Sequence, residues 1–318
     1  MNSPSHIVFL DRGTLPVAMR ASALPLQWHE HESTLPEQVV ERLEHAEVAI
    51  SNKVPLMAAQ LAQLTRLRLI AVAATGTNNV DLDYCREHGI AVCNVSGYST
   101  DSVAEHTFAL LLALRRQVHS YHADILAKAW QSSAHFALLS HPLNDLHGST
   151  LGIFGYGHIG QAVARIAEAF GMRVLVAERK NATVVRAGRV PFGQMLEEAD
   201  VVTLHFPLTP ETRNLIAEPE LRRMKPAAIL LNLARGGMVD EVALAKALRE
   251  KWIAGAGVDV LTTEPPRAGN PLLEVAGPSC IITPHVAWAS QQSLLRLAEE
   301  IVCNIEAFYA GEPRNRIV

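Results

Sequence analysis

Short apolar runs alternate with stretches of helical spacing along most of the chain. Such runs, bounded by turn residues, indicate strands buried on both faces, and the spacing between them indicates helices. Thr34-Leu35-Pro36-Glu37 has the form of a capping box that opens a helix to His45, and Gly89 closes a helix over Asp81–His88. This alternation predicts parallel sheets with helices on both faces. The expected strands are Ile7–Leu10, Val48–Ser51, Leu69–Ala73, Ala91–Asn94, Thr150–Phe154, Arg173–Ala177, Val201–Leu204, Ala228–Asn232, Gly255–Val260 and Cys280–Ile282.

A longer helix, expected over Asp101–Tyr121, separates two such α/β arrays. Its stretch Phe108–Leu114 is almost continuously apolar, so we expect it to be buried at the junction of two domains. The length of 318 residues also suits two domains. The less periodic stretch Trp130–Gly148 is interpreted as a surface excursion or an oligomer contact. Further helices are expected over Pro55–Leu64, Ile159–Phe170 and Ser290–Tyr309.

The second array opens on a glycine-rich turn, Gly155-Tyr156-Gly157-His158-Ile159-Gly160. The turn follows an apolar strand and opens a helix, which is the context of a dinucleotide-binding loop. In that interpretation Gly155 allows the tight turn, Gly157 lets backbone amides approach a pyrophosphate, and Gly160 lets helix and strand pack closely. Glu178, at the end of the next strand, would accept hydrogen bonds from the adenosine ribose. The alternative is a glycine turn that binds nothing.

Three later segments place polar side chains just past expected strands: Arg235, Glu264 and His285. The carboxyl ends of parallel strands share one sheet edge, where ligands of doubly wound folds bind. Reduction of a 2-oxo acid needs a proton donor, and histidine is the natural donor near neutral pH. A carboxylate would orient that histidine, and an arginine fork would grip the substrate carboxylate and carbonyl. Taken singly, each residue has an ordinary alternative as a solvated charge or a satisfied polar group.

The bulk composition argues against several classes of protein. With 28 Lys and Arg against 32 Asp and Glu, the net charge is −4, and no basic field indicates a nucleic-acid partner. The apolar runs are too short to indicate a membrane span. The cysteines show no metal-binding spacing, so we expect no metal site and reduced thiols in a cytoplasmic protein. They are Cys85, Cys93, Cys280 and Cys303.

The order of the chemical motifs resembles that of the D-isomer-specific 2-hydroxyacid dehydrogenase family. The resemblance covers essentially the whole chain. It implies an α/β fold of two doubly wound domains: a Rossmann NAD-binding domain, residues 99–285, inserted into a flavodoxin-like substrate-binding domain, residues 1–98 and 286–318. It also implies NAD as the cofactor, with NADP as an alternative, and a homodimer. The motifs are the glycine loop, His205-Phe206-Pro207-Leu208-Thr209-Pro210-Glu211-Thr212, the Asn232–Glu241 stretch, Glu264 with its prolines, and Thr283-Pro284-His285-Val286-Ala287-Trp288.

The resemblance also implies a substrate site. The backbone amides of Thr75, Gly76 and Thr77 would hold the substrate carboxylate, because such a turn binds anions without a charged side chain. The alternative is a plain turn before a helix. Lys53 and Trp288 are candidates for the substrate pocket, with a surface lysine and a domain-interface aromatic as the alternatives.

Other positions match the family's catalytic and cofactor-binding motifs. The catalytic roles fall on Arg235, Glu264 and His285, because each matches its motif position. The implied cofactor-binding positions are Gly155, Gly157, His158, Ile159, Gly160, Glu178, Arg179, His205, Pro207, Thr212, Leu233, Ala234, Asp259 and Ala287.

Within the family, Thr75–Asp81 and His285–Ser290 look most like the segments of glycerate dehydrogenases, also called hydroxypyruvate reductases. We therefore expect hydroxypyruvate, reduced to D-glycerate, as the best substrate. The alternatives are a glyoxylate, broad 2-oxo acid or phosphonate dehydrogenase, and a non-catalytic NAD-sensing corepressor. NADH is expected to be preferred because Glu178 would repel the 2′-phosphate of NADPH, although Arg179 or Lys180 could pair with that phosphate.

Overall fold

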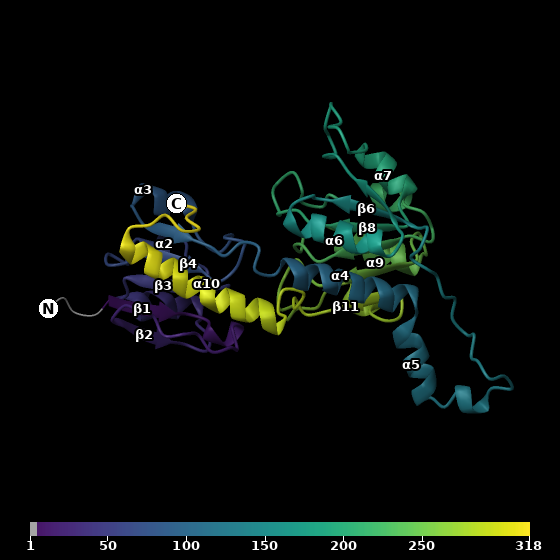
Figure 1. The fold of residues 1–318 in the computed structure, drawn as a ribbon, viewed down its shortest axis with the longest axis horizontal. Helices are drawn as coiled ribbons and strands as arrows, with labels where there is room; N and C mark the ends of the chain where they lie inside the picture. The colour runs from purple at the N-terminus through teal and green to yellow at the C-terminus, as the bar shows by residue number, and fades with distance from the viewer. Residues whose placement is uncertain (1–4) are drawn as a thin grey trace. The chain divides into compact units, whose positions relative to one another are not determined.

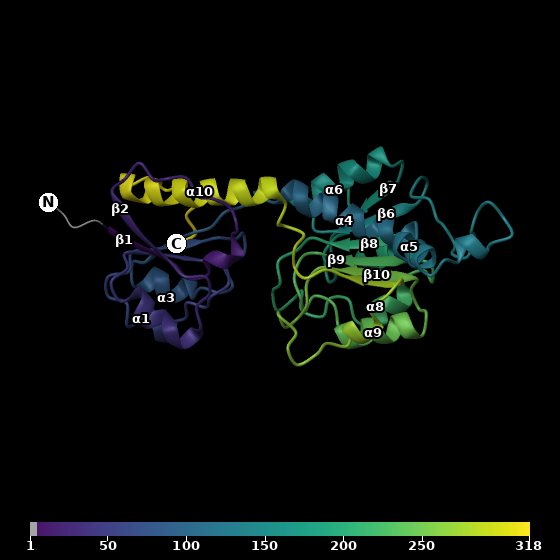
Figure 2. The ribbon, with the colours of Figure 1, turned by 90° about the horizontal axis from the view of Figure 1, so that it is seen from below.

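The computed structural model describes residues 5–318, which form two compact units. Among these, unit 1 comprises residues 5–99 together with residues 289–318, and unit 2 comprises residues 100–288. The sequence predicted domain boundaries after residues 98 and 285. The observed boundaries lie one and three residues later, after residues 99 and 288. Unit 2 is therefore inserted into unit 1, as Figures 1 and 2 show.

Unit 1 is built on a five-stranded parallel sheet of order β2-β1-β3-β4-β5, which is the flavodoxin-like order. Helices α1 and α3 lie on one face of the sheet and α10 on the other (Figure 2). The elements are β1 (Ser5–Phe9), η1 (Arg12–Thr14), β2 (Leu26–Glu30), η2 (Pro36–Gln38), α1 (Val39–Leu43), β3 (Val48–Ser51), α2 (Ala58–Leu61), β4 (Leu69–Val72), α3 (Leu82–Glu87), β5 (Ala91–Cys93) and α10 (Gln291–Ala310).

Unit 2 holds a six-stranded parallel sheet of order β11-β10-β9-β8-β6-β7. A single parallel bridge, Ala177 with Val190, extends it beyond β7, which completes a Rossmann-like order. One core lies beneath α4 and α6, and the other lies beneath α7, α8 and α9. The elements are α4 (Thr100–Arg115), α5 (Val118–Leu126), η3 (Trp130–Ser132), β6 (Thr150–Phe154), α6 (His158–Ala169), β7 (Arg173–Val176), α7 (Phe192–Glu198), β8 (Val201–Leu204), α8 (Glu218–Arg223), β9 (Ile229–Asn232), α9 (Glu241–Arg249), β10 (Gly255–Val258), η4 (Leu273–Val275) and β11 (Cys280–Ile282).

The expected fold class is confirmed, and every expected strand is present with its bounds shifted by two residues at most. The strands of β3, β6, β8 and β9 are buried at every position, which explains their continuous apolar character. Strand β2 was not predicted. It lies at the sheet edge, and its Gln27, His29 and Glu30 interrupt the apolar run on which strand prediction depends.

Three helix predictions are wrong in detail. The long helix expected over Asp101–Tyr121 is broken into α4 and α5 at Gln117, which has a left-handed φ of 51°. The helical ladder ends there because the side-chain amide of Gln117 donates to Leu114 O and the backbone amide of Asn144 donates to Arg115 O. The break turns the chain into the excursion expected over Trp130–Gly148.

The helix expected over residues 34–45 also differs from the structure. Thr34 does not cap it, because its hydroxyl donates to the carbonyl of Leu10. The side chain of Gln38 accepts from the amide of Leu35 at 2.9 Å instead, and a short 3-10 turn precedes a five-residue α1. The helix expected over Pro55–Leu64 shrinks to Ala58–Leu61. Among residues 5–318, no helix is long and apolar enough to cross a membrane.

Candidate active site

The carboxyl ends of β9, β10 and β11 bring the three predicted catalytic segments to one sheet edge. These strands are neighbours in the sheet, and all run parallel. Arg235 follows β9, Glu264 lies in the loop after β10, and His285 follows β11. The edge is where doubly wound sheets bind their ligands.

His285 and Glu264 form a direct pair. His285 Nδ1 lies 2.6 Å from Glu264 Oε2, and the two side chains are 21% and 31% exposed. The second oxygen, Glu264 Oε1, accepts from the amide of Leu261 at 2.7 Å, which fixes the carboxylate against the start of its own loop. Because Nδ1 faces the carboxylate, Nε2 is the ring atom that can exchange a proton with a substrate.

The backbone of His285 is held in an uncommon conformation, with φ of 55°. Asp259 holds the loop in this shape. Its carboxylate is 1% exposed and accepts from Val286 N at 3.0 Å, Ala287 N at 2.9 Å and the hydroxyl of Thr283 at 2.5 Å. Its carbonyl accepts from His285 N at 2.8 Å. The structure thus gives Asp259 a positioning role beside the predicted cofactor role, which stays a prediction.

Arg235 lies on a turn that packs against the loop of Glu264. A Cβ atom at Gly236 would overlap the carbonyl of Leu261, so only glycine allows this approach of the two loops. Asn232, the last residue of β9, donates its side-chain amide to Arg235 O at 3.0 Å. Arg235 is half-buried, and its Nη1 donates to Ala234 O at 2.7 Å.

The glycine loop between β6 and α6 has the geometry of a phosphate cradle. Gly155 has φ of +91°, and a Cβ atom there would overlap the carbonyl of His205. A Cβ atom at Gly160 would overlap Gly155 O, so helix and loop pack as closely as the motif requires. At Gly157 a Cβ atom would meet nothing within 4 Å, which leaves open space in front of the N-terminus of α6, next to His158 and Ile159. The loop therefore fits a dinucleotide pyrophosphate.

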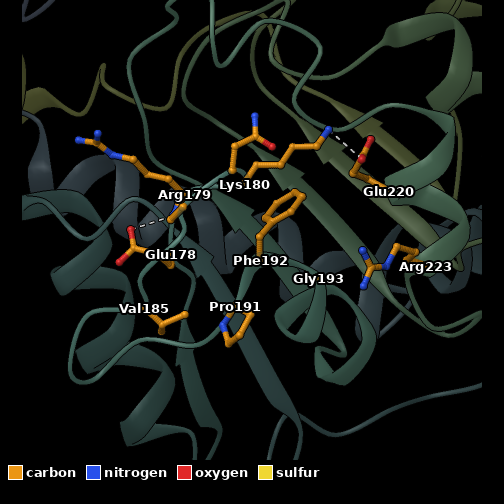
Figure 3. Close-up of a pocket in the computed structure, with 11 residues that line it drawn as sticks. Glu178, Arg179, Lys180, Val185, Pro191, Phe192, Gly193, Glu220 and Arg223 are labelled. Atoms are coloured by element: carbon orange, nitrogen blue, oxygen red, sulfur yellow. Dashed lines mark hydrogen bonds and ion pairs between the residues drawn. The ribbon is translucent and has the colours of Figure 1, made fainter.

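Glu178 is placed at the end of β7 as expected, but its carboxylate is not free for a ribose. It is 2% exposed and pairs with Arg186, whose Nε and Nη2 lie 2.6 Å from its two oxygens. The hydrogen bond to Arg186 lowers the pKa of Glu178 to about 2, with help from the Arg179 amide. A cavity of about 260 Å³ is lined by Glu178 together with Arg179, Lys180 and Phe192 (Figure 3).

The segment after β8 forms a wall beside the glycine loop. His205 Nε2 lies 3.0 Å from the hydroxyl of Thr203, and burial lowers the pKa of His205 to about 4. His205 is therefore neutral at physiological pH. Thr212 closes the following turn, because its hydroxyl donates to Pro207 O at 2.9 Å and accepts from Thr209 N at 2.7 Å.

The remaining predicted residues of unit 2 also lie at this sheet edge. Leu233 is buried, and the amide of Ala234 donates to Asn232 Oδ1 at 3.2 Å. Ala287 O accepts from the hydroxyl of Ser102 on α4 at 2.6 Å. Trp288 is half-buried against the core under α4 and α6, and its Nε1 donates to His285 O at 2.9 Å, so it also steadies the histidine loop.

In unit 1, the predicted anion-binding turn follows β4. The side chain of Asn94 donates to Thr75 O at 2.6 Å, and the Thr75 hydroxyl donates to Val95 O at 2.9 Å, so the turn is fixed from outside. Within residues 5–318, the backbone amides of Thr75, Gly76 and Thr77 have no protein acceptor. Unpaired neighbouring amides are what an anion-binding turn presents.

Lys53 follows the adjacent strand β3 at the same edge of unit 1. Its side chain is exposed, and its backbone amide donates to Asp11 Oδ2 at 2.7 Å. Asp11 also accepts from Asn52 N at 2.9 Å, and burial raises its pKa, against the lowering effect of these amide bonds. Asp11 thus fixes the loop that carries Lys53.

Sequence reasoning missed three side chains that shape these sites. Asp11 follows the end of β1, so the rule used for Arg235 could have found it. His106 of α4 has its Nε2 3.0 Å from the hydroxyl of Thr283. The two residues are 177 positions apart in the sequence, so no local pattern indicated this contact. Arg186 lies in an exposed loop where an arginine is ordinarily solvated.

The glycine cradle, together with a histidine–carboxylate pair and an arginine at one sheet edge, defines a nicotinamide-dependent dehydrogenase. The family model for the NAD binding domain of D-isomer specific 2-hydroxyacid dehydrogenases matches residues 108–287. The chain is 46% identical to the glycerate dehydrogenase of Methylorubrum extorquens over 310 residues, 97% of this chain and 98% of that protein. The chain therefore belongs to the D-isomer specific 2-hydroxyacid dehydrogenase family and is an NAD-dependent enzyme of that family.

Solved structures show the same fold. The D-lactate dehydrogenase of Aquifex aeolicus, in complex with NAD and lactic acid, superposes with a TM-score of 0.81 at 30% identity, covering 97% of each chain. The NADPH-dependent glyoxylate/hydroxypyruvate reductase of Sinorhizobium meliloti, in complex with NADP and malonate, also gives 0.81, at 28% identity, covering 97% of this chain and 94% of that one. The fold thus accommodates either nicotinamide coenzyme in these relatives.

Proposed function

We propose that this enzyme reduces hydroxypyruvate to D-glycerate with NADH, and that His285 gives the proton. The observation that carries the catalytic part is the 2.6 Å pair between His285 and Glu264, at the sheet edge that also bears Arg235. A histidine held by a carboxylate is a proton donor suited to neutral pH. The family sets the reaction class, and these three residues supply the proton donor, its carboxylate partner and the substrate-binding arginine that the reaction needs.

His285, Glu264 and Arg235 are proposed to have separate roles in the reaction. When bound, the nicotinamide supplies the hydride that reaches C2 of the acid. His285 donates the proton on Nε2 to the carbonyl oxygen, and Glu264 stabilises the protonated ring through Nδ1. Arg235 binds the substrate carboxylate and the carbonyl oxygen with its planar fork. In the direction of oxidation, His285 accepts the same proton.

Unit 2 is proposed to hold the coenzyme. The amides of Gly157, His158 and Ile159 lie at the start of α6, where a Cβ atom at Gly157 would meet nothing within 4 Å, and they suit the pyrophosphate. The turn at Pro207 and Thr212 would border the adenosine, together with Glu178 and Arg179. Toward the nicotinamide end, the proposed contacts come from the backbones of Leu233, Ala234 and Ala287 and from Asp259.

Unit 1 is proposed to hold the substrate acid. The unpaired amides of Thr75, Gly76 and Thr77 suit a carboxylate, and Lys53 lies on the neighbouring loop. Trp288 remains a candidate for the pocket wall. Hydroxypyruvate is preferred because glycerate dehydrogenase is the activity named for the 46% identical relative, and oxidation of glycerate at C2 gives hydroxypyruvate.

The test is a kinetic panel of hydroxypyruvate, glyoxylate, pyruvate and 3-phosphohydroxypyruvate, each with NADH and NADPH, with chiral analysis of the products. We expect the highest kcat/KM for hydroxypyruvate and D-glycerate as the product. A higher kcat/KM for glyoxylate or pyruvate would refute the substrate assignment and leave the reaction class standing. An L-product would contradict the family's stereochemistry.

We also propose a homodimer whose contact includes α5 and the segment after it. This part of unit 2 extends away from the sheet (Figure 1), and its Phe136 and Leu139 are 94% and 83% exposed. Exposed apolar surface of this kind ordinarily marks an interface. Light scattering should give twice the 34.6 kDa chain mass, and replacing Phe136 and Leu139 by serine should lower it. A monomeric wild type would refute the proposal. The cytoplasmic location stays a prediction.

A further inference from the structure

The carboxylate of Glu178 has no acceptor capacity left. Arg186 donates from Nε to Oε2 and from Nη2 to Oε1, both at 2.6 Å, and its backbone amide approaches Oε2 at 3.4 Å. The amide of Arg179 donates to Oε1 at 2.9 Å. A carboxylate offers about four lone-pair sites, so these donors fill them. A ribose hydroxyl can bond to Glu178 only if Arg186 withdraws.

Arg186 also changes the charge that this position presents. The carboxylate is buried and the Arg186 side chain is 56% exposed, so the guanidinium is the part that meets solvent. Arg179, the next residue after Glu178, is also exposed, whereas Lys180 pairs with Glu220, 2.8 Å from its Nζ (Figure 3). The outer face of this corner is therefore cationic rather than acidic, which reverses the expectation drawn from Glu178 alone.

We propose that Arg186 determines coenzyme selectivity by neutralising Glu178 and offering its guanidinium to a 2′-phosphate, so that the enzyme accepts NADPH as well as NADH. A planar guanidinium is the side chain best suited to a phosphate. The 2′-phosphate carries about two negative charges near pH 7, so its attraction to Arg186 replaces the repulsion expected from a bare carboxylate. This inference rests on the proposed function only for its use of a nicotinamide coenzyme.

A binding experiment tests this without turnover. Adenosine 2′,5′-bisphosphate and 5′-AMP, which differ by the 2′-phosphate, are titrated calorimetrically into the full chain. The variants are Arg186→Gln, Arg179→Gln and the control Arg173→Gln; Arg173 pairs with Glu198 at 2.7 Å and is similarly exposed. We expect Arg186→Gln to weaken the bisphosphate about ten- to a hundredfold, the effect of one charged hydrogen bond, while AMP binding is retained. Arg173→Gln should change neither.

Several results would overturn the proposal. These are an unchanged ratio of the two affinities in Arg186→Gln, an equal loss for both nucleotides, or a shift in the ratio only in Arg179→Gln. A wild type that binds neither nucleotide would also overturn it. Kinetics then separate this proposal from the function: if the wild type reduces hydroxypyruvate but Arg186→Gln keeps the wild-type NADH to NADPH ratio, only the selectivity role fails. If no 2-oxo acid is reduced, the proposed function fails, and the nucleotide titration still decides the role of Arg186.

Discussion

Replacing Asp259 by asparagine tests whether the histidine loop is held by a charged anchor. The carboxylate is 1% exposed and accepts three hydrogen bonds, from Thr283 Oγ1, Val286 N and Ala287 N. An asparagine side chain has one acceptor oxygen, so its amide group must face at least one of these donors. The Asp259→Asn variant therefore leaves a buried donor without an acceptor.

The expected size of the effect follows from that count. An unsatisfied buried donor costs about 1–3 kcal/mol, and loss of the negative charge weakens the remaining bonds by about 1 kcal/mol. We expect the free energy of unfolding to fall by about 2–4 kcal/mol. Because the same loop carries His285, kcat should fall roughly ten- to a hundredfold, where 1.4 kcal/mol corresponds to tenfold.

The assay combines denaturant unfolding with steady-state kinetics on hydroxypyruvate. Thr283→Val is the matched variant, because it removes one donor and leaves Asp259 charged and bonded to both amides. It should lower stability by about 1 kcal/mol and kcat only a few-fold. An Asp259→Asn enzyme with wild-type stability and kcat would refute the anchoring role. A variant that raises only the KM for NADH would instead assign Asp259 to the coenzyme.

Three further changes probe other parts of the site. Glu264→Gln should lower kcat about ten- to a hundredfold, because it removes the charge from a 2.6 Å bond to His285; wild-type turnover would show that the pair is not functional. Arg235→Lys should raise the KM for hydroxypyruvate and lower kcat, because a point charge cannot replace a planar fork; unchanged constants would make Arg235 structural. His205 has its pKa lowered to about 4, so the unfolded chain binds a proton between about pH 4 and 6.5 that the native state does not. Stability should therefore fall by about 2 kcal/mol from pH 7 to pH 5, and denaturant unfolding of His205→Asn should show less of this loss.

The fold was largely predictable because parallel strands that are buried on both faces have continuous apolar sequences. Strands such as β3 and β8 are buried at every position, so their local sequence decides their structure. Strand β2 and the break at Gln117 depend on distant partners: β2 pairs with β1 at a sheet edge, and Asn144 takes the carbonyl of Arg115. No window of local sequence contains that information.

The same distinction holds for the candidate site. The common location of Arg235, Glu264 and His285 was predictable because each follows a strand, and parallel strands end at a common edge, whereas their catalytic roles stay a prediction. The ion pair between Glu178 and Arg186 was not predictable, because only the folded shape of an exposed loop brings Arg186 to the Glu178 carboxylate. The acidic position at the end of β7 predicted selectivity for NADH, whereas the structure shows that its charge is already compensated.

The proposed reaction depends above all on His285 as the proton donor. The most direct measurement is the turnover of His285→Gln on hydroxypyruvate with saturating NADH, together with its affinity for NADH by fluorescence titration. General acid catalysis ordinarily contributes a factor of about 10² to 10⁴, so kcat should fall by that amount while NADH binding is retained. Near-normal turnover in this variant would show that His285 is not the proton donor.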